Sequence, residues 1–178
     1  MFGGDDRNSS YFLFFPAHMT RDHPGSRFSP RSARLLVTVT DGRGRRKPAG
    51  RLSVWLREVA PKAARGEVAI ALVGDRKMRD LNRQFRGIDK VTDVLSFTVD
   101  PGPVPPVPVA RPLLGDIVIA TGRAAQQARA AGLSEQQEWR RLALHGLLHL
   151  LGHDHERDEG QMFRLERRLR RLGRLPVD

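Results

Sequence analysis

Apolar and polar positions along residues 35–172 alternate between two periodicities. Short runs rich in Val, Ile and Leu predict β-strands at residues 35–39, 67–73, 92–99 and 114–120. Apolar residues spaced three and four apart predict helices at about 50–60, 75–86, 121–132, 134–151 and 162–172. The two kinds of element alternate, which predicts an α/β or α+β fold with a sheet of about four strands and helices around it.

Several predicted helix ends carry capping residues. Asp75 and Thr121 each follow a predicted strand, and we expect both to be N-caps. Ser134 and Gln137 have the spacing of a capping box. Gly152 stands where helices commonly end in a left-handed conformation. The segment between Ser134 and Gly152 therefore predicts a largely buried helix with a defined start and end.

Histidines cluster at the end of this helix, where four of the chain's six lie between residues 145 and 155. His145 and His149 are four residues apart, so both point from one helix face and two imidazoles can bind one ion. After Gly152 the chain can turn back and bring a third imidazole to the same point. His155 is placed for this role, and His153 is the alternative. A single histidine here would ordinarily be interpreted as a polar surface residue and not as a metal ligand.

The histidine pattern favours a metal centre at the end of the buried helix. Three neutral imidazoles favour one Zn²⁺ ion and leave a fourth position open, as in catalytic zinc sites. Ni²⁺, Cu²⁺ or Fe²⁺ also bind imidazole. The spacing matches the long zinc signature of metalloproteases, except that Gly146 stands where those enzymes carry a glutamate base. This difference argues against a peptidase.

The amino-acid composition limits the classes of partner that the chain can bind. The net charge of +11 points to a polyanionic partner, most plausibly nucleic acid, although a solvated arginine-rich surface is the alternative. The chain has no cysteine, which excludes disulfides and thiolate metal sites and permits a cytoplasmic location. The apolar run at residues 11–15 is too short to span a bilayer, and we expect no membrane partner.

The chain divides into a tail and one domain. Residues 1–33 show neither the helical nor the strand periodicity and are rich in Gly, Ser and Pro, so we expect a poorly ordered N-terminal extension. Residues 34–174 are predicted to form a single metal-dependent hydrolase domain. Within it, residues 101–112 hold six of the chain's twelve prolines, which predicts a stiff exposed loop.

Three segments in this order and spacing resemble the YbeY family, metal-dependent endoribonucleases of rRNA maturation and ribosome quality control. They are residues 81–97 (LNRQFRGIDKVTDVLSF), 114–119 (LGDIVI) and 145–155 (HGLLHLLGHDH). The likeness extends over about residues 35–172 and leaves the N-terminal extension unmatched. Two positions depart from the family pattern: His153 stands where tyrosine is usual, and Val91 where proline is usual.

The resemblance implies a set of site residues and partners. It implies an α+β fold with a mixed sheet, zinc ligands at His145, His149 and His155, and a functional arginine at Arg86. A guanidinium suits this role because it binds two phosphate oxygens in a fixed fork. The implied partner is RNA, specifically rRNA or the small ribosomal subunit, and no DNA is expected. The oligomeric state stays open.

Together with the histidine pattern, the resemblance implies a zinc-dependent endoribonuclease that prefers single strands and acts in rRNA processing and ribosome quality control. Two alternatives remain: a non-enzymatic RNA-binding ribosome assembly factor with a structural zinc, and a metallopeptidase-like hydrolase. Asp116 and Asp154 are candidate acceptors that could orient a ligand histidine. Aspartates beside strand and helix ends more often bind backbone amides instead.

Overall fold

The computed structural model describes residues 34–99, 112–154 and 158–177. The predicted N-terminal extension and most of the proline-rich loop lie outside these residues, so both stay predictions.

A mixed four-stranded sheet forms the centre of the domain. Its strands are β1 (Leu36–Asp41), β2 (Glu67–Val73), β3 (Val94–Thr98) and β4 (Leu113–Ala120). Their spatial order is β1-β2-β4-β3. β1 and β4 both run parallel to β2, whereas β3 runs antiparallel to β4. The predicted α+β class and the mixed sheet of four strands are therefore confirmed, and β3 is an edge strand among the described residues.

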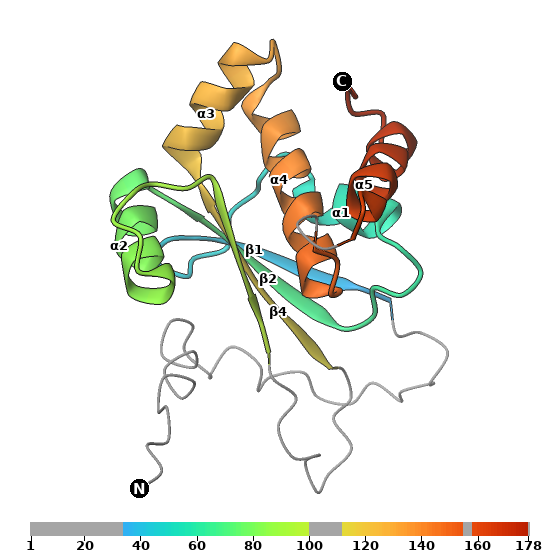
Figure 1. Ribbon diagram of the computed structural model, residues 1–178, viewed down its shortest axis with the longest axis horizontal. Coiled ribbons are helices and arrows are strands. Elements are labelled where there is room, and N and C mark those ends of the chain that lie inside the picture. The colour runs from blue at the N-terminus through green and yellow to red at the C-terminus, as the bar shows by residue number, and fades with distance from the viewer. Residues whose placement is uncertain (1–33, 100–111, 155–157, 178) are drawn as a thin grey trace, which may run out of the picture. The chain divides into compact units, whose positions relative to one another are not determined.

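Five described helices surround the sheet (Figure 1). They are α1 (Leu52–Val59), α2 (Asp75–Arg86), α3 (Thr121–Ala130), α4 (Glu135–Leu150) and α5 (Gln161–Leu172). α2 lies on one side of the sheet, and α1, α4 and α5 lie on the other (Figure 1). Among the described residues, no helix combines the length and apolar content needed to cross a bilayer.

The two faces of the sheet bury different side chains. Ile117 and Ile119 of β4 belong to the large core that includes Leu144 and Leu147 of α4. Side chains alternate along a strand, so Asp116 and its neighbours at even positions point to the opposite face. There Phe97, the cross-strand partner of Asp116, packs edge-to-face on Phe85 of α2, with ring centroids 5.1 Å apart.

Both ends of α4 are capped as predicted. The Ser134 hydroxyl accepts the backbone N–H of Gln137, and the Gln137 side chain accepts the N–H of Ser134 at 2.8 Å. At the other end Gly152 has a φ of 86°, and the N–H of His153 donates to the carbonyl of Leu148 at 3.1 Å. These bonds satisfy backbone groups that the helix itself leaves open. The helix therefore holds its histidines at a fixed end.

The predicted N-caps at Asp75 and Thr121 are wrong. Each is the first residue of its helix, and neither side chain caps its own helix. β2 and β4 are parallel neighbours, so α2 and α3 begin side by side and exchange contacts. The Asp75 carboxylate accepts the N–H of Arg123 in α3 at 3.0 Å. The Thr121 hydroxyl donates to the carbonyl of Val73 at 3.1 Å. The side chains of Asp75 and Thr121 thus bond to residues of other elements instead of to the backbone of their own helices.

A glycine lets α4 approach the sheet closely. A Cβ atom at Gly146 would lie 2.9 Å from a methyl carbon of Ile117 and 3.0 Å from the hydroxyl oxygen of Ser96. Both distances are shorter than ordinary van der Waals contact. The Ser96 hydroxyl instead donates to the carbonyl of Gly146 at 3.3 Å. The Ser96 side chain therefore packs directly on the backbone of α4, with no side chain of the helix between them at this point.

The substitution Gly146→Ala tests this packing. Alanine has a helix propensity about 1 kcal/mol better than glycine, yet the overpacking should cost about 1–3 kcal/mol. We expect a net loss in the free energy of unfolding, measured by urea denaturation. A variant that is more stable than the wild type would show that α4 and β3 have room for the methyl group.

Candidate active site

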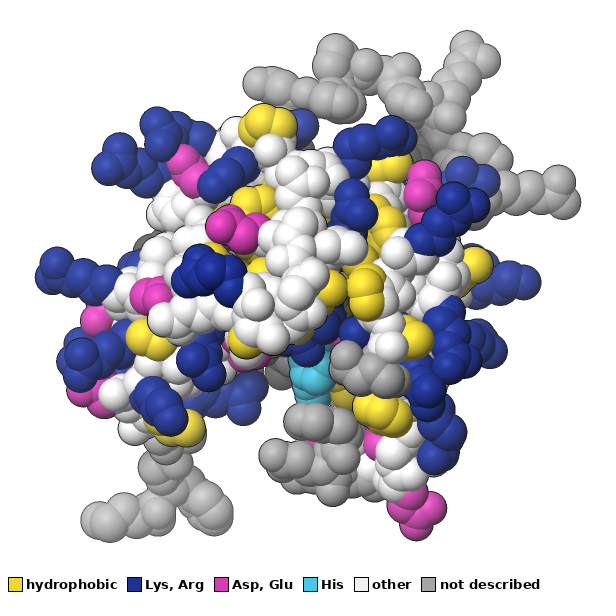
Figure 2. Space-filling view, turned by 90° about the horizontal axis from the view of Figure 1, so that it is seen from above, with side chains coloured by type: hydrophobic (Ala, Val, Ile, Leu, Met, Phe, Trp, Pro, Cys, Tyr) yellow, Lys and Arg dark blue, Asp and Glu magenta, His cyan; other side chains and the backbone are white. Residues whose placement is uncertain are grey.

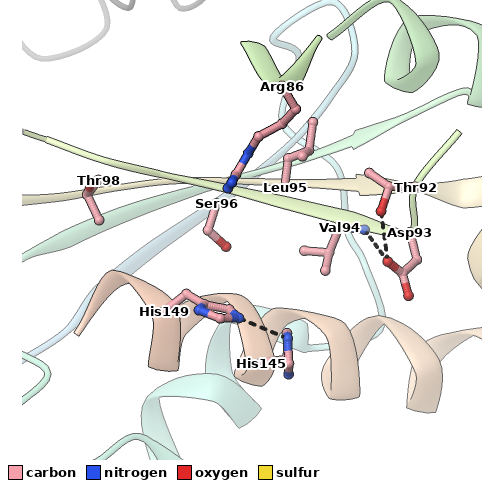
Figure 3. A pocket seen from close by; sticks show the side chains of 9 residues that line it. All are labelled: Arg86, Thr92, Asp93, Val94, Leu95, Ser96, Thr98, His145 and His149. Carbon is pink, nitrogen blue, oxygen red and sulfur yellow. Dashed lines mark hydrogen bonds between the residues drawn. The ribbon is translucent and has the colours of Figure 1, made fainter. Parts of the chain in front are cut away.

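A pocket of about 430 Å³ lies between the edge strand β3 and helix α4 (Figure 3). The end of α2 borders it on the far side of β3. Its lining combines two imidazoles, one guanidinium, one carboxylate and three hydroxyl groups with aliphatic side chains: Arg86, Thr92, Asp93, Val94, Leu95, Ser96, Thr98, His145 and His149. The pocket thus contains three of the four predicted site residues.

His145 and His149 converge as their spacing predicts. Their Nε2 atoms lie 3.1 Å apart, and the rings are edge-to-face with centroids 4.7 Å apart (Figure 3). Two nitrogens bound to one tetrahedral zinc at about 2.0–2.1 Å would lie about 3.3–3.4 Å apart. The observed separation is close to this value. The pair therefore fits a shared metal ion with little rearrangement.

Glu166 of α5 orients the first histidine. Its Oε2 lies 3.0 Å from Nδ1 of His145, and only 13% of its side chain is exposed. A carboxylate at this position holds the proton on Nδ1 and leaves the lone pair of Nε2 for a metal. No motif in the sequence singles out Glu166. The available signal was its position, since it shares one helix face with the buried Met162 and Leu169.

Asp116 does not fill the orienting role considered for it. It projects from the face of β4 opposite α4, away from the histidines. Burial raises the pKa of its carboxyl group to about 6. The same role for Asp154 stays a prediction.

Arg86 is the last residue of α2, and the backbone places it beside β3. The helix ends at Gly87, whose φ of 71° is left-handed. The following loop is tied back to α2, because Arg79 donates two hydrogen bonds to the Asp89 carboxylate at 2.8 and 2.7 Å. The loop that follows Arg86 is therefore folded back along α2.

The guanidinium of Arg86 is available for a ligand. It forms no hydrogen bond or ion pair with any described residue, and its side chain extends toward β3 (Figure 3). Figure 2 shows a histidine on this face with Lys and Arg side chains to both sides of it. A guanidinium that lines the same pocket as two imidazoles suits an anionic group.

Asp93 lies at the start of β3, and its carboxylate accepts three hydrogen bonds. Its carboxylate accepts the N–H of Val94 at 2.9 Å, the hydroxyl of Thr92 at 3.3 Å and the side-chain amide of Gln127 at 2.8 Å. Burial acts to raise the pKa of Asp93, but these hydrogen bonds outweigh it and the pKa is lowered. Asp93 therefore stays ionised at neutral pH and organises the pocket wall.

The third metal ligand stays a prediction. His155 lies outside the described residues. His153 ends the helix through its backbone and is not among the residues that line the pocket. Within residues 34–99, 112–154 and 158–177, no three His, Asp or Glu side chains are placed to hold a metal together.

The position next to His145 cannot carry a general base. Gly146 faces the sheet, where even a Cβ atom would be too close to Ile117 and Ser96. A glutamate there would have to displace α4 from β3. The departure from the metalloprotease pattern is therefore built into the packing of the fold.

Comparisons with known proteins place the pocket within a shared region. The model of the family described as Endoribonuclease YbeY matches residues 50–172, which include Arg86, His145, His149, His155 and Glu166. A protein of that name from Solibacter usitatus is 45% identical over 133 residues, which cover 74% of this chain and 82% of the relative. One from Anaeromyxobacter sp. is 49% identical over 110 residues, 61% of this chain and 55% of that relative.

A solved structure shares the fold. The chain is similar to the solution structure of TM1509 from Thermotoga maritima, with a TM-score of 0.53 and 26% identity. The alignment covers 78% of this chain and 89% of the Thermotoga protein.

The raised pKa of Asp116 predicts a pH effect on stability. The carboxyl group has an ordinary pKa of 3.8 and a pKa of about 6 when folded. The folded state then holds the proton more tightly, so the free energy of unfolding falls as the pH rises between these values. The full loss is about 3 kcal/mol.

Asp116→Asn should remove this loss, because an amide does not ionise. Compared with the wild type, the variant should gain up to about 3 kcal/mol in its free energy of unfolding at pH 8 relative to pH 4. Urea denaturation of both proteins at the two pH values measures this. If the free energies of unfolding of the variant and the wild type differed equally at both pH values, the raised pKa of Asp116 would be contradicted.

Proposed function

The chain belongs to the YbeY family, and on that premise we propose that it is a metal-dependent endoribonuclease that cleaves single-stranded RNA. The curated relatives are named endoribonucleases, and the matched region contains the whole pocket. The observation that carries the proposal is the meeting of Arg86, His145 and His149 in one pocket. These side chains provide two metal-ligating nitrogens and one phosphate-binding fork.

One zinc ion is proposed at the histidines, with His155 as the third ligand. The 3.1 Å separation of the two Nε2 atoms and the Glu166 bond to His145 support this assignment. A bound zinc would supply Lewis-acid stabilisation of a phosphodiester under attack. Glu166 keeps the ring of His145 in the tautomer and orientation that binding requires.

Arg86 is proposed to bind the scissile phosphate. Its guanidinium cannot lose its proton and can contact two phosphate oxygens as negative charge develops there. The chain's net charge of +11 would draw RNA toward this face and make binding salt-dependent. Flexible single strands can enter a pocket beside an edge strand more easily than a duplex.

The proposed substrate is rRNA, or the small ribosomal subunit that contains it, in rRNA processing and ribosome quality control. The family likeness over residues 50–172 supports this assignment.

Glu166→Gln tests the metal site without using activity. An amide is a weaker and less directional partner for Nδ1–H, so we expect zinc affinity to fall about 10- to 100-fold. Competition with a chromophoric chelator measures the affinity. Glu159→Gln is the control, since Glu159 is exposed and precedes the same helix. Equal zinc affinity in all three proteins would remove Glu166 from the site.

Cleavage of an end-labelled single-stranded RNA tests the function. Arg86→Ala should lower the cleavage rate about 10²- to 10³-fold, because the phosphate loses its charged partner in the transition state. His149→Ala should abolish both zinc retention and cleavage. Arg129→Ala, an exposed arginine on α3 outside the pocket, should cut like the wild type.

The result also separates an enzyme from a binding factor. If the wild type binds RNA and retains zinc but does not cut, the RNA-binding assembly factor becomes the better account. If Arg86→Ala and His149→Ala cut as fast as the wild type, the pocket is not the active site.

A further inference from the structure

The hydrogen bonds between β3 and β4 determine which groups of β3 face outward. The N–H of Ala120 donates to the carbonyl of Asp93 at 2.9 Å. In an antiparallel ladder the bonded residues alternate, so Leu95 and Phe97 also direct their backbone groups toward β4. Val94, Ser96 and Thr98 therefore direct their N–H and C=O groups away from the sheet.

In two of these three residues, neither the outward N–H nor the outward C=O has a partner among the described residues. The Asp93 carboxylate occupies the N–H of Val94 at 2.9 Å. The N–H and C=O groups of Ser96 and Thr98 form no hydrogen bond with another described residue. Each of these two residues thus presents one donor and one acceptor side by side along an open edge. Exposed edges of this kind bind other chains readily.

The open edge is part of the active-site pocket. Ser96 and Thr98 both line it, together with Arg86 on one side of β3 and the two histidines on the other (Figure 3). The hydroxyl of Ser96 contacts the backbone of α4 at Gly146, one residue from His145. A ligand held by the edge would therefore lie directly beside the proposed cleavage centre.

We propose that the main-chain edge of Ser96 and Thr98 binds the Watson–Crick edge of an unpaired RNA base next to the scissile phosphate. This inference rests on the proposed function and adds to it a means of recognition. The phosphate would bind Arg86, and the base would bind β3.

The chemistry of the edge favours a base over a phosphate. A phosphate offers only acceptors, and the outward carbonyls of β3 would repel it. The Watson–Crick edge of every base carries at least one donor next to an acceptor. One extended residue offers the complementary pair. The Arg86 guanidinium has no partner among the described residues. Together with the net charge of +11, it favours RNA over a peptide strand.

This recognition would select unpaired RNA with little preference for sequence. In a duplex the Watson–Crick edges are already occupied by the complementary strand. Main-chain groups also cannot distinguish bases as finely as a dedicated side chain can. Single-strand preference would then arise from the sheet itself and not from aromatic stacking.

Amide hydrogen exchange of the wild-type protein tests the proposal directly. The probe is a short single-stranded RNA with 2′-O-methyl sugars, which resists cleavage through the 2′ position and keeps its base edges. In the saturated complex, the amides of Ser96 and Thr98 should exchange at about one-tenth of their rate in the free protein, or more slowly still. The amides of Leu95 and Phe97, already bonded to β4, should change little.

Three results would overturn the proposal. Unchanged exchange at Ser96 and Thr98 in the saturated complex would place the RNA elsewhere, and the proposed function would still stand. Protection without RNA that grows with protein concentration would identify a second copy of the chain on the edge. Protection without RNA at every concentration would mean that the chain covers its own edge.

A matched pair of variants at Thr98 gives an independent test. Thr98→Pro removes the outward N–H, and proline is tolerated at such positions of edge strands. Thr98→Val keeps the N–H and removes only the hydroxyl. We expect Thr98→Pro to bind the single-stranded probe about three- to tenfold more weakly than Thr98→Val. The same probe annealed to its complement should bind both variants equally.

Thermal unfolding of both variants shows whether β3 is intact. Equal binding of the single-stranded probe by folded Thr98→Pro and Thr98→Val would overturn the proposal. Should Thr98→Pro fail to fold, the exchange experiment on the wild type decides alone. Cleavage by the wild type is measured in parallel, so a failure of the nuclease function is seen separately.

Discussion

The close approach of α4 to the sheet is the constraint on which the site depends. It requires a residue without a side chain at Gly146, because Ile117 and Ser96 fill the space where a Cβ would lie. With the helix at this distance, His145 and His149 stand next to the edge strand instead of above the centre of the core. A bulkier residue would separate the imidazoles from the strand that forms the other wall of the pocket.

The pocket joins segments that are far apart in the sequence, and each is held by its own contacts. Asp93 anchors the start of β3 through three hydrogen bonds. The Arg79–Asp89 pair fixes the turn that follows Arg86. Glu166 reaches α4 from α5. Because these contacts restrain the backbone around the pocket, the conformational entropy lost on binding falls mainly on side chains such as Arg86.

Local patterns predicted the elements, and long-range contacts account for what they missed. The four strands, the capping box at Ser134 and the helix end at Gly152 depend on residues within a few positions, and all are confirmed. Asp75 and Thr121 were assigned wrongly because their bonding partners belong to a neighbouring strand and helix. Glu166 was missed for the same reason, since its partner lies 21 residues earlier. No local pattern could reveal which carboxylate the fold brings to His145.

The strand order also has a consequence for the folding pathway. β2 pairs with β4 and not with β3, so Ile70 finds its partner Ile117 across a long stretch of chain. Such non-local pairing is slow, because a large loop must close, at a cost in entropy, before any contact between the strands stabilises it. The face on which α4 packs belongs to β3 and β4, which are antiparallel neighbours and can pair without β2. The slow pairing step therefore lies on the side of β4 away from the pocket, whose walls β3 and α4 flank β4 in the sequence.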